Sequence, residues 1–176
     1  MQKLSMEQLN RADIDSFKRQ EKIPVVIVLD NVRSMHNVGS AFRTADGFAI
    51  EKVLLLGITG TPPHREIEKT ALGATQSVEW HYHKDNVEAV RQLRAQGYKV
   101  YAVEQATGSV DLQEVAIADG GKYALVFGNE VYGVDENIMQ LVDGCIEIPQ
   151  FGTKHSFNVS VTIGIVLWEF VRKLNF

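Results

Sequence analysis

Polar residues of the kinds that bind and activate substrates gather in three stretches of the chain, each after an apolar run. The first, LDNVRSMHNVGSAFRTADGF, holds Asn37, Gly39 and Arg43 at spacings of two and four residues. We predict that Asn37 caps a helix, that Gly39 permits close approach of another backbone, and that Arg43 lies one turn beyond Gly39. An arginine near a helix start is poorly placed for the helix dipole, which indicates another role. The alternative is a capped helix with a solvent-facing arginine.

The second stretch, VFGNEVYGVDENI, reads as a strand, a turn and a helix, with Gly128 and Gly133 in the turn. Glu130 directly follows the apolar run. An unpaired buried carboxylate is costly, so we expect Glu130 to be paired or functional. The alternative is a tight turn with an exposed glutamate.

The third stretch, EIPQFGTKHSFNVSVTIGIVLWEF, places Ser156 and Asn158 where a loop enters an apolar helix. Either residue also suits a helix N-cap. The helix is apolar almost all round, which predicts burial against more than one surface. Gly164 in its middle favours close packing against another helix, of this chain or of a partner chain. A homodimer interface explains both features.

Strands that alternate with helices must position these stretches. Apolar runs predict strands at 25–30, 52–57, 98–104, 123–128 and 145–149, with a weaker edge strand at 77–83. Helical patterns cover 6–19, 39–48, 65–72, 86–96, 135–141 and 157–174. This alternation predicts an α/β fold with a mostly parallel sheet flanked by helices. We expect one domain over 1–176, with a helical extension at 1–22, and ligands at the carboxyl ends of the strands.

Composition narrows the class of protein. One cysteine, Cys145, among 176 residues excludes an internal disulfide and a cysteine-based zinc site, and we expect it to be a core residue. The absence of a long apolar run predicts a cytoplasmic protein without signal peptide or membrane span. Neither G-x-G-x-x-G after the first strand nor a phosphate-binding loop motif occurs. Glu79, His81 and His83 lack a third histidine nearby, so we expect no metal. The net charge of −4 argues against nucleic-acid binding by bulk charge alone.

Three segments, taken in their order along the chain, resemble the three motifs of the SpoU/TrmH family of SPOUT RNA methyltransferases. They are DNVRSMHNVGSAFRTAD, FGNEVYG and IPQFGTKHSFNVSVTIGI. The resemblance runs from about residue 25 to the end of the sequence. It implies an α/β sheet with a C-terminal deep trefoil knot that binds S-adenosylmethionine. It also implies methyl transfer to a ribose 2′-hydroxyl of tRNA or rRNA, with tRNA favoured. The family works as a homodimer through the last helix.

The resemblance assigns roles to residues. It implies that the catalytic residues are Arg43, Asn37, Glu130, Ser156 and Asn158. It also implies that the cofactor-binding residues are Glu104, Gln105, Gly128, Ile148 and Phe157. Phe157 stands where leucine is usual, and Thr162 where alanine is common. The role of Arg43 stays open between assisting deprotonation together with an RNA phosphate and orienting that phosphate and the ribose.

The negative net charge does not exclude RNA binding, because electrostatic steering depends on the local potential around basic patches. We expect the RNA to be held by Arg33, His36, Lys154 and His155. Two alternatives remain. One is a catalytically silent knotted factor for RNA binding or ribosome assembly, and the other is a small-molecule methyltransferase. The presence of Arg43, Glu130, Ser156 and Asn158 favours the RNA enzyme over a silent factor.

Overall fold

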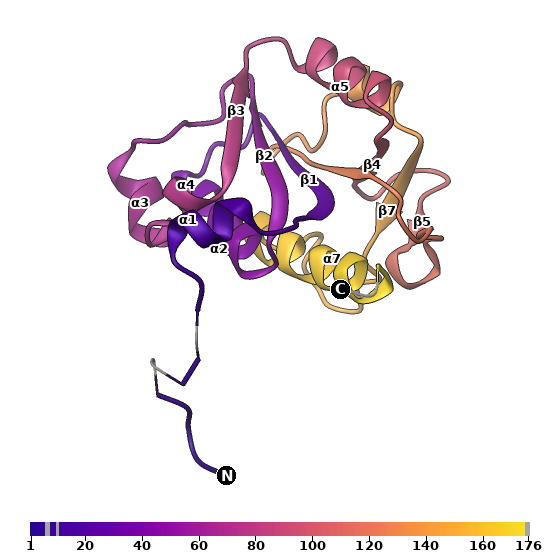
Figure 1. Ribbon diagram of the computed structural model, residues 1–176. Helices are drawn as coiled ribbons and strands as arrows, with labels where there is room; N and C mark the ends of the chain where they lie inside the picture. Colours follow the sequence, from indigo (N-terminus) through magenta and orange to yellow (C-terminus); the bar gives the residue numbers. More distant parts are fainter. Residues whose placement is uncertain (6–7, 10, 175–176) are drawn as a thin grey trace.

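A sheet of parallel strands is the centre of the computed structural model, which describes residues 1–5, 8–9 and 11–174 (Figure 1). Within these residues the strand order is β3-β2-β1-β6-β4-β7-β5. The strands are β1 (Ile23–Asp30), β2 (Ile50–Leu56), β3 (Glu79–His83), β4 (Lys99–Val103), β5 (Val110–Asp111), β6 (Tyr123–Phe127) and β7 (Gly144–Glu147). The predicted parallel α/β fold and the edge position of β3 are confirmed. The two-residue β5 was not predicted, because it is too short to show a periodicity.

Helices cover both faces of the sheet. They are α1 (Ile14–Arg19), α2 (Met35–Gly47), α3 (Arg65–Ala71), α4 (Ala74–Ser77), α5 (Asn86–Ala95), α6 (Glu136–Met139) and α7 (Val159–Lys173), with a 3-10 turn at Leu112–Glu114. One core packs α1 to α4 and α7 against the sheet, and the other packs α5 and α6 against the opposite face (Figure 1). None of the helices in the described ranges has the length and apolar character that crossing a bilayer requires. The knot implied by the resemblance stays a prediction.

The first helix is shorter than the pattern predicted. It begins at Ile14, because the Asp13 side chain caps it by accepting a hydrogen bond of 2.8 Å from the Ser16 N–H. Residues 6, 7 and 10 of the predicted helix lie outside the described residues. Pro24 lies inside β1 rather than ahead of it, at the shift in register between Ile23 and Val26, where a proline is tolerated.

Helix α2 begins four residues earlier than predicted. Ser34 is the N-cap and accepts a hydrogen bond from the Asn37 N–H, so the prediction that Asn37 caps the helix is wrong. Asn37 lies in the first turn instead, which leaves its side-chain amide available for another partner. The close approach expected at Gly39 is present. A Cβ there would lie 2.1 Å from Thr70 Oγ1 and 2.2 Å from the Ile67 carbonyl oxygen of α3.

Helix α7 begins at Val159 and is capped by Asn158, whose side chain accepts a hydrogen bond of 2.9 Å from the Ser160 N–H. Its inner face is buried, whereas Val161 and Trp168 on the outer face are 49% and 58% exposed. A Cβ on Gly164 would meet nothing within 4 Å. The close packing expected at Gly164 is therefore not made within this chain.

Candidate active site

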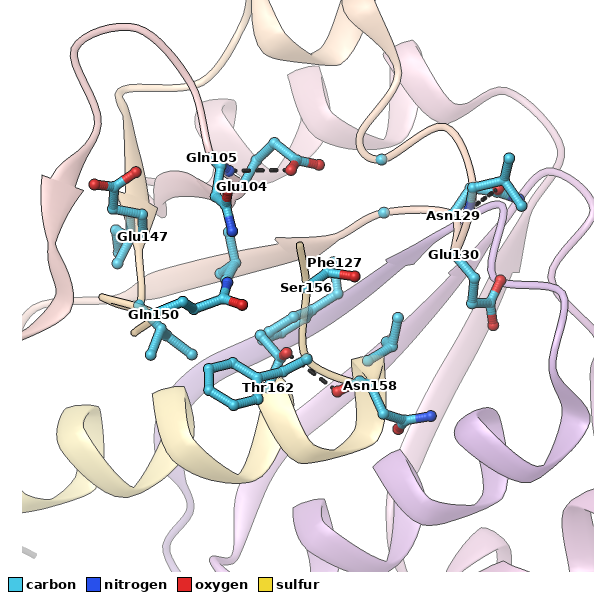
Figure 2. Close-up of a pocket in the computed structure, with 18 residues that line it drawn as sticks. Glu104, Gln105, Phe127, Asn129, Glu130, Glu147, Gln150, Ser156, Asn158 and Thr162 are labelled. Carbon is cyan, nitrogen blue, oxygen red and sulfur yellow. Dashed lines mark hydrogen bonds between the residues drawn. The ribbon is translucent and has the colours of Figure 1, made fainter. Parts of the chain in front are cut away.

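A cavity of about 390 Å³ opens at the carboxyl ends of β4, β6 and β7 and beside the start of α7 (Figure 2). It lies at that edge because the ends of parallel strands, and the loops that follow them, share one side of the sheet. Its lining residues are 103–105, 127–131, 133, 146–148, 150, 156–159 and 162.

Most of the predicted site residues lie around this cavity. All five predicted cofactor residues line it, namely Glu104, Gln105, Gly128, Ile148 and Phe157. Three of the predicted catalytic residues, Glu130, Ser156 and Asn158, line it as well (Figure 2). Segments far apart in sequence thus meet at one place, as the hydrogen bond of 3.0 Å from Gln105 Nε2 to the carbonyl of His155, 50 residues later, illustrates.

The turn after β6 forms one wall through close backbone contacts. A Cβ on Gly128 would lie 2.1 Å from the Gly133 carbonyl carbon and 2.2 Å from the Val134 nitrogen, so only glycine fits. The Glu104 carboxylate fastens this turn by accepting hydrogen bonds from the N–H groups of Val134, at 3.2 Å, and Gln105, at 3.0 Å. Glu104 therefore shapes the wall with both of its oxygens engaged by backbone.

Glu130 ties the exit of β6 to the start of α2. It accepts hydrogen bonds from the Arg33 N–H at 2.9 Å, the Ser34 N–H at 3.0 Å and the Asn37 side-chain amide at 3.0 Å. Burial by itself raises the pKa of Glu130, but these N–H donors outweigh it and hold the pKa below its ordinary value. Glu130 is exposed rather than buried, yet it is paired as expected.

Asp30 at the end of β1 is a residue that the sequence patterns did not single out. It is fully buried and accepts hydrogen bonds from the Asp135 N–H at 2.8 Å, the Asn31 amide at 2.9 Å and the Asn86 amide. Burial raises the pKa of Asp30 above its ordinary value, while the hydrogen bonds from Asp135 and Asn86 oppose that rise. The available signal was a carboxylate closing an apolar run, VVIVLD.

The remaining predicted residues lie outside the cavity lining. Arg43 is exposed on α2, and Asn37 reaches the cavity only through Glu130. The four predicted RNA-binding residues, Arg33, His36, Lys154 and His155, are all exposed on the surface, at or near loops. His81 Nε2 lies 2.9 Å from Glu79 Oε1, and the described residues hold no group of three side chains arranged for a metal. Cys145 is half-buried.

Comparison with known proteins places these features in a family. The model of the SpoU rRNA Methylase family matches residues 24–168. The chain is 32% identical over 163 residues to the tRNA (guanosine(18)-2′-O)-methyltransferase of Thermus thermophilus, covering 93% of this chain and 82% of that protein. It is also 32% identical over 168 residues to a 23S rRNA (guanosine-2′-O-)-methyltransferase of Vibrio parahaemolyticus, covering 95% of this chain and 66% of that protein.

Two solved structures show the same fold. The TrmH/SpoU tRNA modifying enzyme of A. aeolicus superposes with a TM-score of 0.79 at 28% identity, covering 90% of this chain and 79% of that one. The AdoMet-bound rRNA methyltransferase of Sinorhizobium meliloti superposes with a TM-score of 0.81 at 28% identity, covering 92% of this chain and 60% of that one.

Proposed function

Because the chain belongs to the SpoU rRNA methylase family, we infer that it is an S-adenosylmethionine-dependent RNA methyltransferase that acts on a ribose 2′-hydroxyl. The observation that carries this inference is the meeting of the three motif stretches at one edge of the sheet. The second and third stretches line the cavity, and the first is joined to it through the hydrogen bonds of Glu130.

The cavity suits S-adenosylmethionine in size and charge. Its volume falls in the range of small-molecule sites, about 300–1,000 Å³. Its lining includes the carboxylates of Glu104, Glu130 and Glu147, and the described lining residues include no Lys, Arg or His. An acidic lining favours a ligand with a sulfonium and an ammonium group. When bound, the cofactor supplies an electrophilic methyl group. We assign its binding to Glu104, Gln105, Gly128, Ile148 and Phe157.

The catalytic residues act mainly by positioning. A ribose hydroxyl must lose its proton as it attacks, yet arginine is almost always protonated. We therefore assign Arg43 the role of orienting an RNA phosphate and the ribose, so that placement supplies much of the rate. Glu130 holds Asn37 in place, and Ser156 and Asn158 order the loop beside the target ribose.

We also propose that the protein forms a homodimer through α7. Val161 and Trp168 leave an apolar strip exposed on this helix, and the Trp168 ring centroid lies 6.3 Å from that of Phe48 at the end of α2. Arg43 lies on α2 and outside the cavity lining of its own chain. A catalytic Arg43 therefore needs either RNA that bridges the distance or the cavity of the second protomer.

We favour tRNA over rRNA as the substrate. In support, the chain covers 82% of the relative named as a tRNA methyltransferase but 66% of the relative named as a 23S rRNA methyltransferase. The cytoplasm, where both kinds of RNA are processed, is the compartment we assign. The second candidate, a silent RNA-binding factor, would bind these RNAs without transferring a methyl group.

Single-turnover transfer of a labelled methyl group from S-adenosylmethionine tests the function, using tRNA and rRNA fractions from a strain that lacks the gene. We expect label in the tRNA fraction, and a rate about 100-fold lower for Arg43→Ala with cofactor affinity unchanged. Arg91→Ala, on the exposed face of α5, is the matched control. No transfer to either fraction would contradict the enzyme assignment, and a near-normal rate for Arg43→Ala would contradict its role.

Mixed dimers test whether Arg43 serves the other protomer. Arg43→Ala and Ser156→Ala, the latter in the cavity lining, are each expected to be nearly inactive alone. Activity recovered on mixing them indicates a site shared between protomers, since one cavity of the heterodimer then has both residues. Mixtures that stay inactive, although heterodimers form, place Arg43 and Ser156 in the same site of one protomer.

A further inference from the structure

Two cations, Arg65 and Lys69, and one histidine surround a carboxylate on the outer surface of α2 and α3. The Glu66 carboxylate accepts hydrogen bonds from Lys69 Nζ at 2.8 and 3.0 Å, and His36 Nε2 lies 2.9 Å from it. Arg65 Nε is 4.0 Å away. Hydrogen bonds from Lys69 and His36 hold the pKa of Glu66 below its ordinary value, so that this acceptor is ionised at neutral pH. We call His36, Arg65, Glu66 and Lys69 the Glu66 cluster.

The Glu66 cluster adjoins the proposed active site through a continuous set of contacts. His36 precedes Asn37, whose amide donates to Glu130 in the cavity wall. The Thr70 hydroxyl donates 3.0 Å to the His36 carbonyl, which fixes α3 against α2 at this point. The Glu66 cluster is therefore fixed to the same turn of α2 that Glu130 joins to the cavity wall.

Stability does not account for the arrangement. The side chains of Arg65, His36 and Lys69 are 85%, 59% and 52% exposed. Exposed ion pairs contribute little to the free energy of folding, about 0–1 kcal/mol. Arg65 and Lys69 face one carboxylate, so their two positive charges exceed its single negative charge even when His36 is neutral. Such a set of donors suits an anion that carries several acceptor oxygens, as a phosphate does.

We propose that His36, Arg65 and Lys69 bind a phosphate of the RNA backbone next to the methylated ribose. In the free protein the Glu66 carboxylate occupies the position of that phosphate. The inference rests on the proposed function and extends it to α3, which none of the three motif stretches includes. The RNA phosphate accepts hydrogen bonds from His36, Arg65 and Lys69, and the Glu66 carboxylate turns to solvent. Binding here is to the backbone, so it positions the RNA without reading its sequence.

The double variant Arg65→Gln/Lys69→Gln tests the site by filter binding of the tRNA and rRNA fractions over a range of salt concentrations. We expect affinity to fall about tenfold, and the slope of log affinity against log salt concentration to decrease by about 0.7–0.9 for each phosphate that the variant does not neutralise. Cofactor affinity should stay unchanged. The matched control is Lys99→Gln/Lys122→Gln, which removes the same charge at the amino ends of β4 and β6. An equal loss of affinity in both double variants would overturn the proposal, because bulk charge would then explain the binding.

Glu66→Gln tests the place-holding role separately. We expect RNA affinity to rise several-fold, since the variant leaves His36, Arg65 and Lys69 without a competing carboxylate. Weaker or unchanged RNA binding would overturn that role. Thermal unfolding of each variant checks that the exposed substitutions leave the fold intact. Both tests read RNA binding rather than methyl transfer, so an absence of transfer by the unmodified protein would count against the proposed function and not against this site.

Discussion

The two halves of the sheet, divided at the β1–β6 pair, differ in the polar side chains that they place at one edge. On the β1 to β3 side, α2 and α3 present His36, Arg65 and Lys69 to solvent. On the β4 to β7 side, a cavity is lined by Glu104, Glu130 and Glu147. The net charge of −4 averages over this division and says little about either half. A cationic cofactor and an anionic backbone can thus be held apart until they meet at the boundary.

Two carboxylates cross that boundary in opposite directions. Glu130 extends from the β6 exit to the first turn of α2, and Asp30 extends from the end of β1 to the Asp135 N–H after β6. Between them the Asn129 amide donates 2.7 Å to the Asn31 carbonyl. The halves are therefore fixed to one another by groups that also shape the cavity.

The largest effect is expected from replacing Glu130, the carboxylate that joins the two halves of the sheet. Glu130→Gln puts an amide where three N–H donors converge, so Asn37 and the start of α2 lose their fixed position. We expect the single-turnover methyl-transfer rate to fall about 100-fold, as misplacement of reacting groups does. Glu136→Gln, exposed on α6, is the control. Equal rates for both variants would show that the boundary does not control the reaction.

A second substitution damages the acidic half alone. Gly128→Ala drives a Cβ into the backbone of Gly133 and Val134, and we expect the free energy of unfolding to fall by about 3 kcal/mol, with loss of cofactor binding. Gly152→Ala is the control, because a Cβ there meets nothing within 4 Å. Urea unfolding and calorimetric titration with S-adenosylmethionine measure the two effects. Should Gly128→Ala bind the cofactor normally, the turn is not part of its site.

The two crossing carboxylates should respond to pH with opposite sign. The folded-state pKa of Glu130 is lowered, so its stabilising contribution is present above the unfolded value of 4.5 and is lost as pH falls through the folded pKa. The folded-state pKa of Asp30 is raised, so stability declines as pH rises from the unfolded value of 3.8 through the folded pKa.

Melting curves from about pH 3 to 7 for the unmodified protein, Glu130→Gln and Asp30→Asn measure this difference. Toward neutral pH the unmodified protein should gain stability relative to Glu130→Gln and lose it relative to Asp30→Asn. Parallel curves for all three proteins would mean that neither carboxylate changes its pKa on folding.

The smallest expected effect concerns α7, which packs against both halves through α2 and through the Phe170 contacts with Tyr101 and Tyr123. Gly164→Ala should stabilise the isolated chain by about 1 kcal/mol, because nothing lies within 4 Å of the new Cβ and alanine favours helix. If Gly164 packs closely against a second protomer, the same change weakens the dimer. Light scattering over a dilution series separates the outcomes, and an unaltered dimer would remove Gly164 from the interface.

The sequence patterns predicted those strands and helix contacts that depend on residues close together in the chain. The apolar runs of β1 and β6 indicated strands buried on both faces, and Gly39 indicated a close helix contact. The start of α2 was missed because Ser34 and Asn37 are both good caps. The choice is made by Glu130, 96 residues later, which binds the Ser34 N–H. Asp30 was missed for the same reason, since its partners Asn86 and Asp135 lie 56 and 105 residues away.

The strand order has a consequence for biosynthesis. Strand β7 lies between β4 and β5, although β5 follows β4 directly in the chain and precedes β7 by more than 30 residues. A nascent chain that ends before Gly144 has no neighbour for β5 and lacks the 146–162 part of the cavity wall. On the proposed assignment of the cavity to S-adenosylmethionine, translation must proceed well past β6 before the cofactor can bind. Ribosome-bound intermediates should then be unable to bind it while already presenting the cations of α3.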